Sequence, residues 1–390
     1  MRQTIAAATA ALCLTSAASA DLDITIHYLR VETAKPPTLS NLDPIPEDLG
    51  LAGARVGLDD NTTTGRFLGQ SYTLTETTVP EAQDPTDAAR AALAETDLIV
   101  LDAPAEALRT IADLPEADGA LLFNATAPDM ALRGPECRAN VLHTMPSLAM
   151  RTDALAQFFV TKRWDTLALI AGEQQADEAF AAAMRTSLTK FGLGLEAEKT
   201  WAFDADMRRN AAQEVPLFTQ DLGEYDALIV ADEAHDFGRY ILYNTWRPRP
   251  VAGSEGLQAE AWAPVVEQWG AAQLQSRFTE AAGRDMAPED YAAWAAVRAI
   301  GEAVTRTSAA DAATLRAYLL GDEFELAGFK GRPLTFRTWN GQLRQPIPLI
   351  HARALVAQAP LDGFLHQRTE LDTLGLDAPE SGCAAFEAAR

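Results

Sequence analysis

The residues best suited to proton transfer lie in one short stretch, where Asp232 and Glu233 are followed by His235 and Asp236. Carboxylates beside an imidazole can serve as general acid and general base. The stretch follows an apolar run, however, and a solvated loop at the end of a strand explains it more simply. No GxSxG turn and no HExxH helix accompanies it. We therefore expect that the protein is not an enzyme. The alternative is a secreted enzyme that uses Asp232, Glu233 and His235 as acid-base groups.

Residues that hold metals or nucleotides are also poorly grouped. The five histidines have no metal-ligand spacing, and no CxxC pair occurs. Asp59-Asp60-Asn61 resembles half of a calcium loop but lacks the glycine and the terminal glutamate of an EF-hand. A GK[ST] phosphate loop and a GxGxxG turn after the first strand are both absent. We expect neither a metal nor a catalytic cofactor.

The N-terminus has the pattern of a secretory signal peptide. Arg2 precedes an apolar run from Ile5 to Leu14, which is shorter than the about 20 residues that span a bilayer. Ala18-Ser19-Ala20 then gives the small-x-small pattern of a cleavage site. We expect cleavage near Ala20 and release of the chain into the periplasm.

Charge and cysteine content narrow the partners and the compartment. The 390 residues carry a formal net charge of -23, which argues against nucleic acid or an anionic membrane surface as partner. Cys137 and Cys383 remain after cleavage. In a secreted chain they favour one disulfide, which would tie the C-terminal tail to the first domain, and two separate thiols are the alternative.

Strand-like and helix-like segments alternate through most of the chain, and its length favours two domains. The order predicts α/β domains with two doubly wound parallel sheets, joined by crossover strands, and a ligand cleft between them. The expected strands are 24–29, 71–79, 98–101, 120–124 and 141–144, and then 167–171, 195–203 and 227–231. The expected helices are 49–60, 85–95, 105–114, 147–161, 176–191 and 210–220.

The later region breaks this alternation. Long helices are expected at 263–282 and 288–308, and strands at 334–337 and 346–349 flank the turn Asn340-Gly341. A last strand is expected at 354–358. The predicted division is 1–20 signal peptide, 21–144 first part of domain 1, 145–262 first part of domain 2, 263–308 helices of domain 1 that span the hinge, 309–344 a return to domain 2, and 345–390 a C-terminal crossover and tail.

The order of elements resembles the type I periplasmic substrate-binding proteins of ABC transporters, the leucine/isoleucine/valine-binding class. Five runs are more specific: Asp60–Phe67, Cys137–Thr144, Thr245–Gly253, Ala327–Gly331 and Trp339–Pro346. They look like one subgroup, which is encoded beside alcohol dehydrogenases that depend on pyrroloquinoline quinone (PQQ). The resemblance implies PQQ as bound ligand, and an ABC transporter permease or a PQQ-dependent dehydrogenase as partner.

One departure from the amino-acid binders concerns the ligand's carboxylate. Those proteins hold it with hydroxyl residues after the third and the fourth strand. Here Asp102 stands after the third strand, and only Thr126 is kept after the fourth, beside Asn124. Leucine-like ligands become less favoured, and a larger or differently charged molecule more so.

The resemblance places the ligand at loops after the strands of both domains, which is the general rule for open α/β sheets. Guanidinium groups would suit the three carboxylates of PQQ, and aromatic faces would suit its ring. Tyr291, Trp294 and Arg298 share one helix face, and either the ligand or the core would explain them. The candidate ligand residues are Arg30, Asp102, Asn124, Thr126, His143, Glu233, Trp246, Arg247, Tyr291, Trp294, Arg298 and Lys330.

Three functions are compatible with these residues. The first is PQQ capture by hinge closure, for transport or for delivery to a dehydrogenase. The second is a binding protein for a branched-chain or other amino acid or a small carboxylate. The third is the secreted enzyme, which should be dropped if His235 points to solvent.

Overall fold

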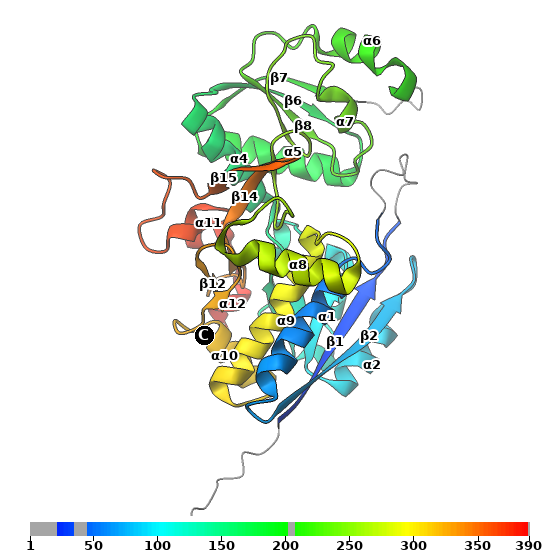
Figure 1. Ribbon diagram of the computed structural model, residues 1–390, viewed down its shortest axis with the longest axis vertical. Coiled ribbons are helices and arrows are strands. Elements are labelled where there is room, and N and C mark those ends of the chain that lie inside the picture. Colours follow the sequence, from blue (N-terminus) through cyan, green and yellow to red (C-terminus); the bar gives the residue numbers. More distant parts are fainter. Residues whose placement is uncertain (1–21, 35–44, 202–206, 389–390) are drawn as a thin grey trace, which may run out of the picture.

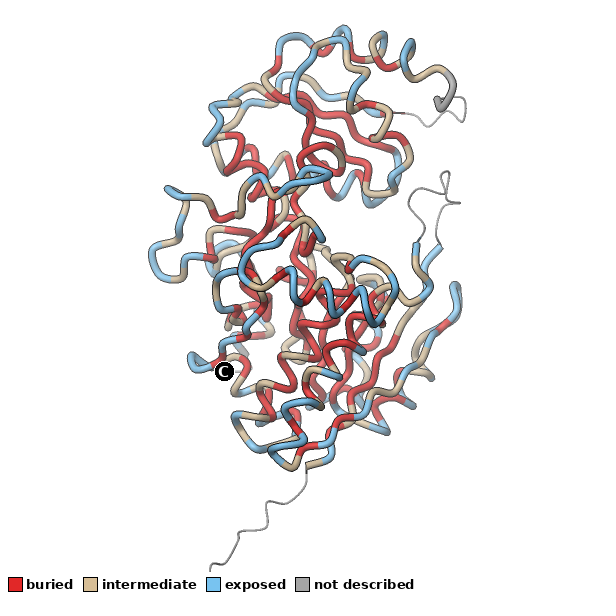
Figure 2. The backbone as a smooth tube through the Cα atoms, in the orientation of Figure 1, coloured by how far each residue is buried: buried red, intermediate tan, exposed pale blue. Residues whose placement is uncertain are grey.

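The computed structural model describes residues 22–34, 45–201 and 207–388, so the expected signal peptide lies outside the described residues. Figure 1 shows two lobes stacked along the long axis, with strands of the C-terminal region running between them. Figure 2 shows a buried centre in each lobe. In the described part of the chain, no helix is both long enough and apolar enough to cross a membrane.

The first domain is built on a parallel sheet in the order β2-β1-β3-β4-β5. Leu98 to Leu101 of β3 are all buried, as expected for a strand covered on both faces. The sheet contains β1 (Leu22–Val31), β2 (Gln70–Val79), β3 (Leu98–Asp102), β4 (Leu121–Asn124) and β5 (Val141–His143). Helices α1 (Leu51–Gly65), α2 (Thr86–Glu95) and α3 (Ala105–Ala112) connect its strands.

The second domain repeats this plan with a parallel sheet in the order β7-β6-β8-β9. Every residue of β8 is buried. The strands are β6 (Thr166–Ala171), β7 (Gly194–Thr200), β8 (Ala227–Ala231) and β9 (Val251–Gly253). The helices are α4 (Leu148–Lys162), α5 (Gln175–Lys190), α6 (Met207–Thr219) and α7 (Gly238–Ile241). The predicted fold class, two doubly wound parallel-sheet domains, is therefore confirmed.

The chain then returns to the first domain and stays there longer than the sequence predicts. The segment 309–344 is expected in domain 2, but its buried side chains pack into the first core, among them Leu315, Phe324, Leu334 and Leu343. Its amphipathic elements cover the first sheet rather than the second. These elements are α10 (Ala312–Leu319), β11 (Leu326–Ala327), β12 (Pro333–Phe336) and β13 (Leu343–Arg344).

Two local expectations also differ from the structure. The helix expected at 263–282 begins only at α8 (Ala271–Ala282), because Trp269 and Gly270 have left-handed backbone angles, φ 58° and φ 83°. The hairpin that contains Asn340-Gly341 pairs β12 with β13. The later strand β14 (Ile347–His351) pairs instead with β15 (Ala354–Ala359) and with β10 (Gln258–Ala259).

Before the C-terminal tail, three segments of the described chain pass from one core to the other, and the tail returns to the first core between Leu374 and Cys383. Met145 belongs to the first core and Leu148 to the second, Ala259 to the second and Ala261 to the first, and Leu343 to the first and Ile347 to the second. The crossovers therefore lie at 145–148, 259–261 and 343–347. Chain segments this short allow the two domains to rotate about them.

Helix α9 (Pro288–Thr307) fixes the geometry at the top of the first domain. It packs closely on α1, where a Cβ added to Gly53 would lie 1.8 Å from the carbonyl oxygen of Asp290. Only a residue without a side chain permits this approach of the two backbones. The N-terminus of α9 is thereby held beside the N-terminus of α1.

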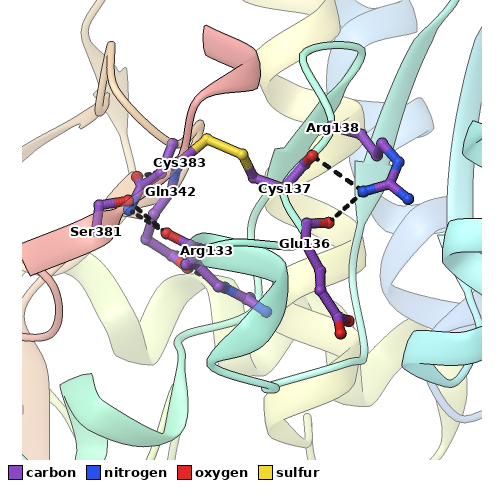
Figure 3. Close-up of a disulfide and its surroundings, with 8 residues drawn as sticks. Arg133, Glu136, Cys137, Arg138, Gln342, Ser381 and Cys383 are labelled. Atoms are coloured by element: carbon purple, nitrogen blue, oxygen red, sulfur yellow. Dashed lines mark hydrogen bonds between the residues drawn. A yellow bond between two sulfur atoms is a disulfide. The ribbon is translucent and has the colours of Figure 1, made fainter. Parts of the chain in front are cut away.

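A disulfide joins the C-terminal tail to the first domain. The sulfur atoms of Cys137 and Cys383 are 2.00 Å apart and the residues are separated by 246 positions in the sequence. Figure 3 shows the bond beside Arg133, whose backbone carbonyl accepts a hydrogen bond from Ser381 at 2.6 Å. Cys383 lies between the short helices α11 (Ala378–Ser381) and α12 (Ala385–Ala388).

Candidate functional site: a charged cluster between the two domains

The carboxyl end of the first sheet presents Arg30, Asp102 and Thr126. Arg30 and Asp102 are paired in register on β1 and β3, and Arg30 Nε donates to Asp102 Oδ2 at 2.8 Å. Tyr28 donates to the same oxygen at 2.9 Å, and Thr126 donates to Asp102 Oδ1 at 2.7 Å. The acid therefore has donors on both oxygens.

Asn124 holds the backbone of the loop after β4, and its side chain does not point toward a ligand. Its side-chain oxygen accepts from the backbone amides of Thr126 and Ala127 at 3.2 and 2.9 Å. Its amide nitrogen contacts Nδ1 of His143 at 3.0 Å. Asn124 and His143 are both fully buried, and burial lowers the pKa of His143 well below its ordinary value. These two predicted contacts therefore support the loop from beneath.

Glu289 enters from the first turn of α9. The neighbouring Asp290 anchors that turn, because it accepts from the backbone amide of Gly50 at 2.8 Å and from Arg284 at 2.7 and 3.0 Å. Asp290 also accepts from the amide of Ala287 at 2.9 Å, which caps the helix. With Asp290 held in this way, the carboxylate of Glu289 lies within electrostatic range of Glu260 on a crossover and of Asp102 in the first domain.

The second domain contributes a guanidinium shared by two acids. Arg151 Nη1 and Nη2 donate to the Glu233 carboxylate at 2.6 and 3.2 Å, and Nη2 also donates to Glu260 Oε1 at 3.1 Å. Its Nε donates to the carbonyl of Ala259 at 2.9 Å. Glu233 accepts in addition from the hydroxyl of Ser254 at 2.8 Å. The side chains of Arg151, Glu233 and Glu260 are each only 12–20% exposed.

We call seven of these residues the interdomain cluster: Arg30, Asp102, Thr126, Arg151, Glu233, Glu260 and Glu289. Burial raises the pKa of Glu289 to about 7, and the charges of Glu260, Asp290 and Asp102 add to the effect. Burial also raises the pKa of Glu260, against the attraction of Arg151. The pKa of Glu233 is lowered, because its contact with Arg151 outweighs its burial. The guanidinium of Arg151 thus compensates the charge of Glu233 fully and that of Glu260 only in part.

The nearby Asp177 and Asp232 have structural roles. Asp232 accepts from the amides of Asp236, Phe237 and Gly238 at 2.8, 3.0 and 2.6 Å. Asp177 accepts from the amides of Gln174 and Glu233. The side chain of His235 is 55% exposed, 3.8 Å from Glu255. The acid-base stretch of the sequence is therefore a capped turn, and its imidazole is about half exposed beside Glu255.

Three predicted ligand residues on α9 belong to the domain core. Tyr291 is fully buried between Trp262 and Trp294 and donates to the carbonyl of Gly328 at 2.7 Å. Trp294 donates to Asp60 at 3.0 Å. Arg298 donates to Asn61 of α1, and it lies nine residues beyond Glu289, about 13 Å along the helix axis. Helix α9 does begin at the interdomain cluster. Its first turn contributes Glu289 to the cluster, whereas the helix face that carries Tyr291, Trp294 and Arg298 packs inside the first domain.

Lys330 lies at the hinge and not at the cluster, although the sequence places it among the ligand residues. Its ammonium donates to Gln345 Oε1 at 2.5 Å and to the carbonyl of Pro346 at 3.2 Å, and it lies 4.5 Å from the ring centre of Tyr291. Burial lowers its pKa well below the ordinary value. It lines a cavity of about 350 Å³ together with Trp269, Arg332 and Asp362, and none of the cluster residues lines that cavity.

Trp246 and Arg247 lie at the opposite edge of the second sheet. They precede β9, whereas the cluster lies beyond the carboxyl ends of the strands. Trp246 is 59% exposed, its backbone amide donates to Thr219 at 2.8 Å, and Arg247 pairs with Glu224 at 2.8 Å. The pattern of an aromatic beside cations does not reveal which edge of a sheet its loop occupies.

Four of the seven cluster residues are among the ligand residues predicted from the sequence, and Arg151, Glu260 and Glu289 are not. Each of the three lies on or directly after a crossover, or in the first turn of a helix, and none directly follows a strand of the two parallel sheets. Glu289 could have been predicted from its neighbour Asp290, which caps the helix. The first turn of a capped helix that begins beside a hinge is presented to the other domain.

The chain is similar in structure to binding proteins of ABC transporters. A branched chain amino acid ABC transporter periplasmic ligand-binding protein from Burkholderia xenovorans has a TM-score of 0.71 at 16% identity, over 93% of this chain and all of that one. An ABC transporter substrate-binding protein from Desulfitobacterium hafniense in complex with Leu has a TM-score of 0.61 at 14% identity, over 85% and 99%. A solute binding protein of an ABC transporter from R. palustris in complex with benzoate has a TM-score of 0.62 at 12% identity, over 93% and 99%.

These likenesses show the fold, which is that of type I periplasmic binding proteins. No protein-family model and no curated protein matches the sequence.

Proposed function

We propose that this chain is a periplasmic solute-binding protein that encloses a small organic molecule between its domains and delivers it to an ABC-type permease. One observation carries the proposal: the carboxyl ends of both parallel sheets contribute to one charged cluster beside the three crossovers. Open α/β sheets bind ligands at this edge. The structural neighbours that hold leucine and benzoate support the ligand class in kind.

Closure would follow from the way the cluster is divided. Arg30, Asp102 and Thr126 belong to the first domain, and Arg151 and Glu233 to the second. Glu260 lies on the crossover at 259–261. A ligand that touches both groups stabilises the arrangement in which they are near, and its affinity depends on the bonds that form to it when the domains rotate together.

The carboxylate clamp of amino-acid binders is not available in the usual form. Asp102 stands where a hydroxyl residue is expected, and the Thr126 hydroxyl is donated to it. The geometry also gives PQQ little support, because its three carboxylates would meet Asp102, Glu233, Glu260 and Glu289. PQQ is therefore kept only as one of the compounds tested for binding, and a dehydrogenase partner would be considered only if PQQ binds.

The test combines calorimetry with small-angle X-ray scattering on the mature protein. Alkylamines, amino acids, benzoate and PQQ are added separately. We expect saturable one-to-one binding by one class, together with a smaller radius of gyration. A variant at the far edge, Trp246→Ala, should bind as the unaltered protein does. If no class of compound binds and closes the protein, the proposed function is wrong.

A further inference from the structure

The charge of the ligand can be inferred from the pairing of the cluster, and this inference rests on the proposed function. The cluster contains four carboxylates, on Asp102, Glu233, Glu260 and Glu289, and two guanidinium groups, on Arg30 and Arg151. Its location does not depend on this count, because the sheet edges and the crossovers define it. The four acids therefore indicate the charge of the ligand, and they are not needed to locate the site.

Every nitrogen of the two guanidinium groups already has an acceptor. Arg30 donates to Asp102, to the carbonyl of Glu47 at 2.7 Å and to the carbonyl of Leu49. Arg151 donates to Glu233, to Glu260 and to the carbonyl of Ala259. An anionic ligand would have to displace one of these bonds and would leave a nearly buried carboxylate without its partner, which is costly.

The acceptors, in contrast, are not all used. Within the described ranges, Glu289 forms no ion pair and its carboxylate accepts no hydrogen bond from another side chain, and only one oxygen of Glu260 has a donor. The charged groups that interact with Glu289 electrostatically are the acids Glu260, Asp290 and Asp102 and the guanidinium of Arg151. Negative charge from the first domain and from the crossover at 259–261 therefore surrounds Glu289.

We propose that the ligand is a small organic cation, an amine or a guanidinium without a carboxylate of its own, held by Glu289 and Glu260 between the domains. Its charge would supply what the cluster lacks, and its bonds to both acids would join α9 of the first domain to the crossover at 259–261. Charge-assisted hydrogen bonds of this kind are the stronger ones in proteins. Asp102 adds negative potential, while both of its own oxygens stay occupied.

The experiment compares ligands that differ in charge. The probes are alkylamines, alkylguanidines and agmatine as cations, leucine as zwitterion, benzoate and PQQ as anions, and calcium chloride as inorganic cation. Binding is measured by calorimetry at pH 6 and pH 8, for the unaltered protein and for Glu289→Gln. Glu280→Gln on α8, an exposed position, is the matched control.

We expect an organic cation to bind, and Glu289→Gln to weaken it at least tenfold while Glu280→Gln does not. The affinity of the unaltered protein should rise about tenfold from pH 6 to pH 8, because the ionised fraction of a carboxyl with a pKa of about 7 rises from about one tenth to about nine tenths. Glu289→Gln should flatten this dependence. It keeps the amide in the same position, and its melting temperature checks that it folds.

The outcomes separate the two proposals. If leucine, benzoate, PQQ or calcium binds and organic cations do not, the inference is overturned and the proposed function stands. If cations bind but Glu289→Gln binds them equally well, the assignment to Glu289 is overturned. If no probe binds, the proposed function falls and the inference falls with it.

Discussion

Thr126 donates its hydroxyl hydrogen to Asp102, with 2.7 Å between Oγ1 and Oδ1. The hydroxyl after β4 is therefore bonded to a carboxylate of the protein and is not free for a carboxylate of a ligand. The same acid holds Arg30 Nε at 2.8 Å. Asp102 thus occupies two donors that an anionic ligand could otherwise use.

Replacing this acid should change the preferred ligand. In Asp102→Ser, the Thr126 hydroxyl and Arg30 Nε lose their acceptor, and one negative charge leaves the cluster. We expect calorimetry to show at least a tenfold gain in affinity for leucine or benzoate and a loss for organic cations. Thr126→Val in the same background should remove most of the gain. An Asp102→Ser protein that folds but gains no affinity for any carboxylate would contradict this role.

Glu289 should make the folded protein less stable as the pH rises. Its folded pKa of about 7 lies above the ordinary 4.5, so the folded state binds the proton more tightly and loses this advantage between pH 4.5 and pH 7. Glu289→Gln should therefore raise the free energy of unfolding at pH 8 by about 2 kcal/mol, a value discounted for partial solvent screening. Urea unfolding at pH 4.5 and pH 8 measures this, and an equal gain at both values would contradict it.

The close contact between α1 and α9 should tolerate no side chain at Gly53. Its Cβ would lie 1.8 Å from the Asp290 carbonyl oxygen, so Gly53→Ala must push the helices apart. We expect a loss of about 3 kcal/mol in urea unfolding, and weaker ligand binding because Glu289 moves with α9. Gly194→Ala is the control, since its Cβ would meet its nearest atom at 3.4 Å. Equal stability of the two variants would show that the helices adjust freely.

Tyr291 should affect stability and not affinity. Tyr291→Phe removes the hydrogen bond to the Gly328 carbonyl and keeps the stacking on Trp262 and Trp294. The unpaired carbonyl should cost about 1 kcal/mol of unfolding free energy. The dissociation constant of any ligand found should change less than twofold. A tenfold change would return Tyr291 to the ligand site.

The disulfide should stabilise the first domain without touching the site. Cys383→Ser opens a link across 246 positions of the sequence, and a loss of about 2–5 kcal/mol is expected. Cys137 precedes β5 and so lies at the edge opposite the cluster. The variant should bind ligand with unchanged affinity at a temperature where it is folded. Loss of binding in the folded variant would show that the tail acts on the site.

The order of the elements, and the sheet edge where a site would form, can both be read from the amino-acid sequence. Apolar runs such as 98–101 and 227–231 are local patterns, and a strand buried on both faces needs no distant information to be recognised. The residue after each strand could then be named, which located Arg30, Asp102, Thr126 and Glu233. The exchange of a hydroxyl for Asp102 was also visible, because it is a property of one position.

Which charges meet, in contrast, depends on the packing of distant segments. Arg151 lies 82 positions from Glu233 and 109 from Glu260, and no local period connects residues so far apart. The packing of α9 on α1 brings Glu289 within electrostatic range of Glu260 and Asp102 and directs Arg298 to Asn61. The segment 309–344 could cover either sheet by its amphipathic pattern alone. It packs into the first core, and the periodicity of its sequence does not encode which of the two cores it joins.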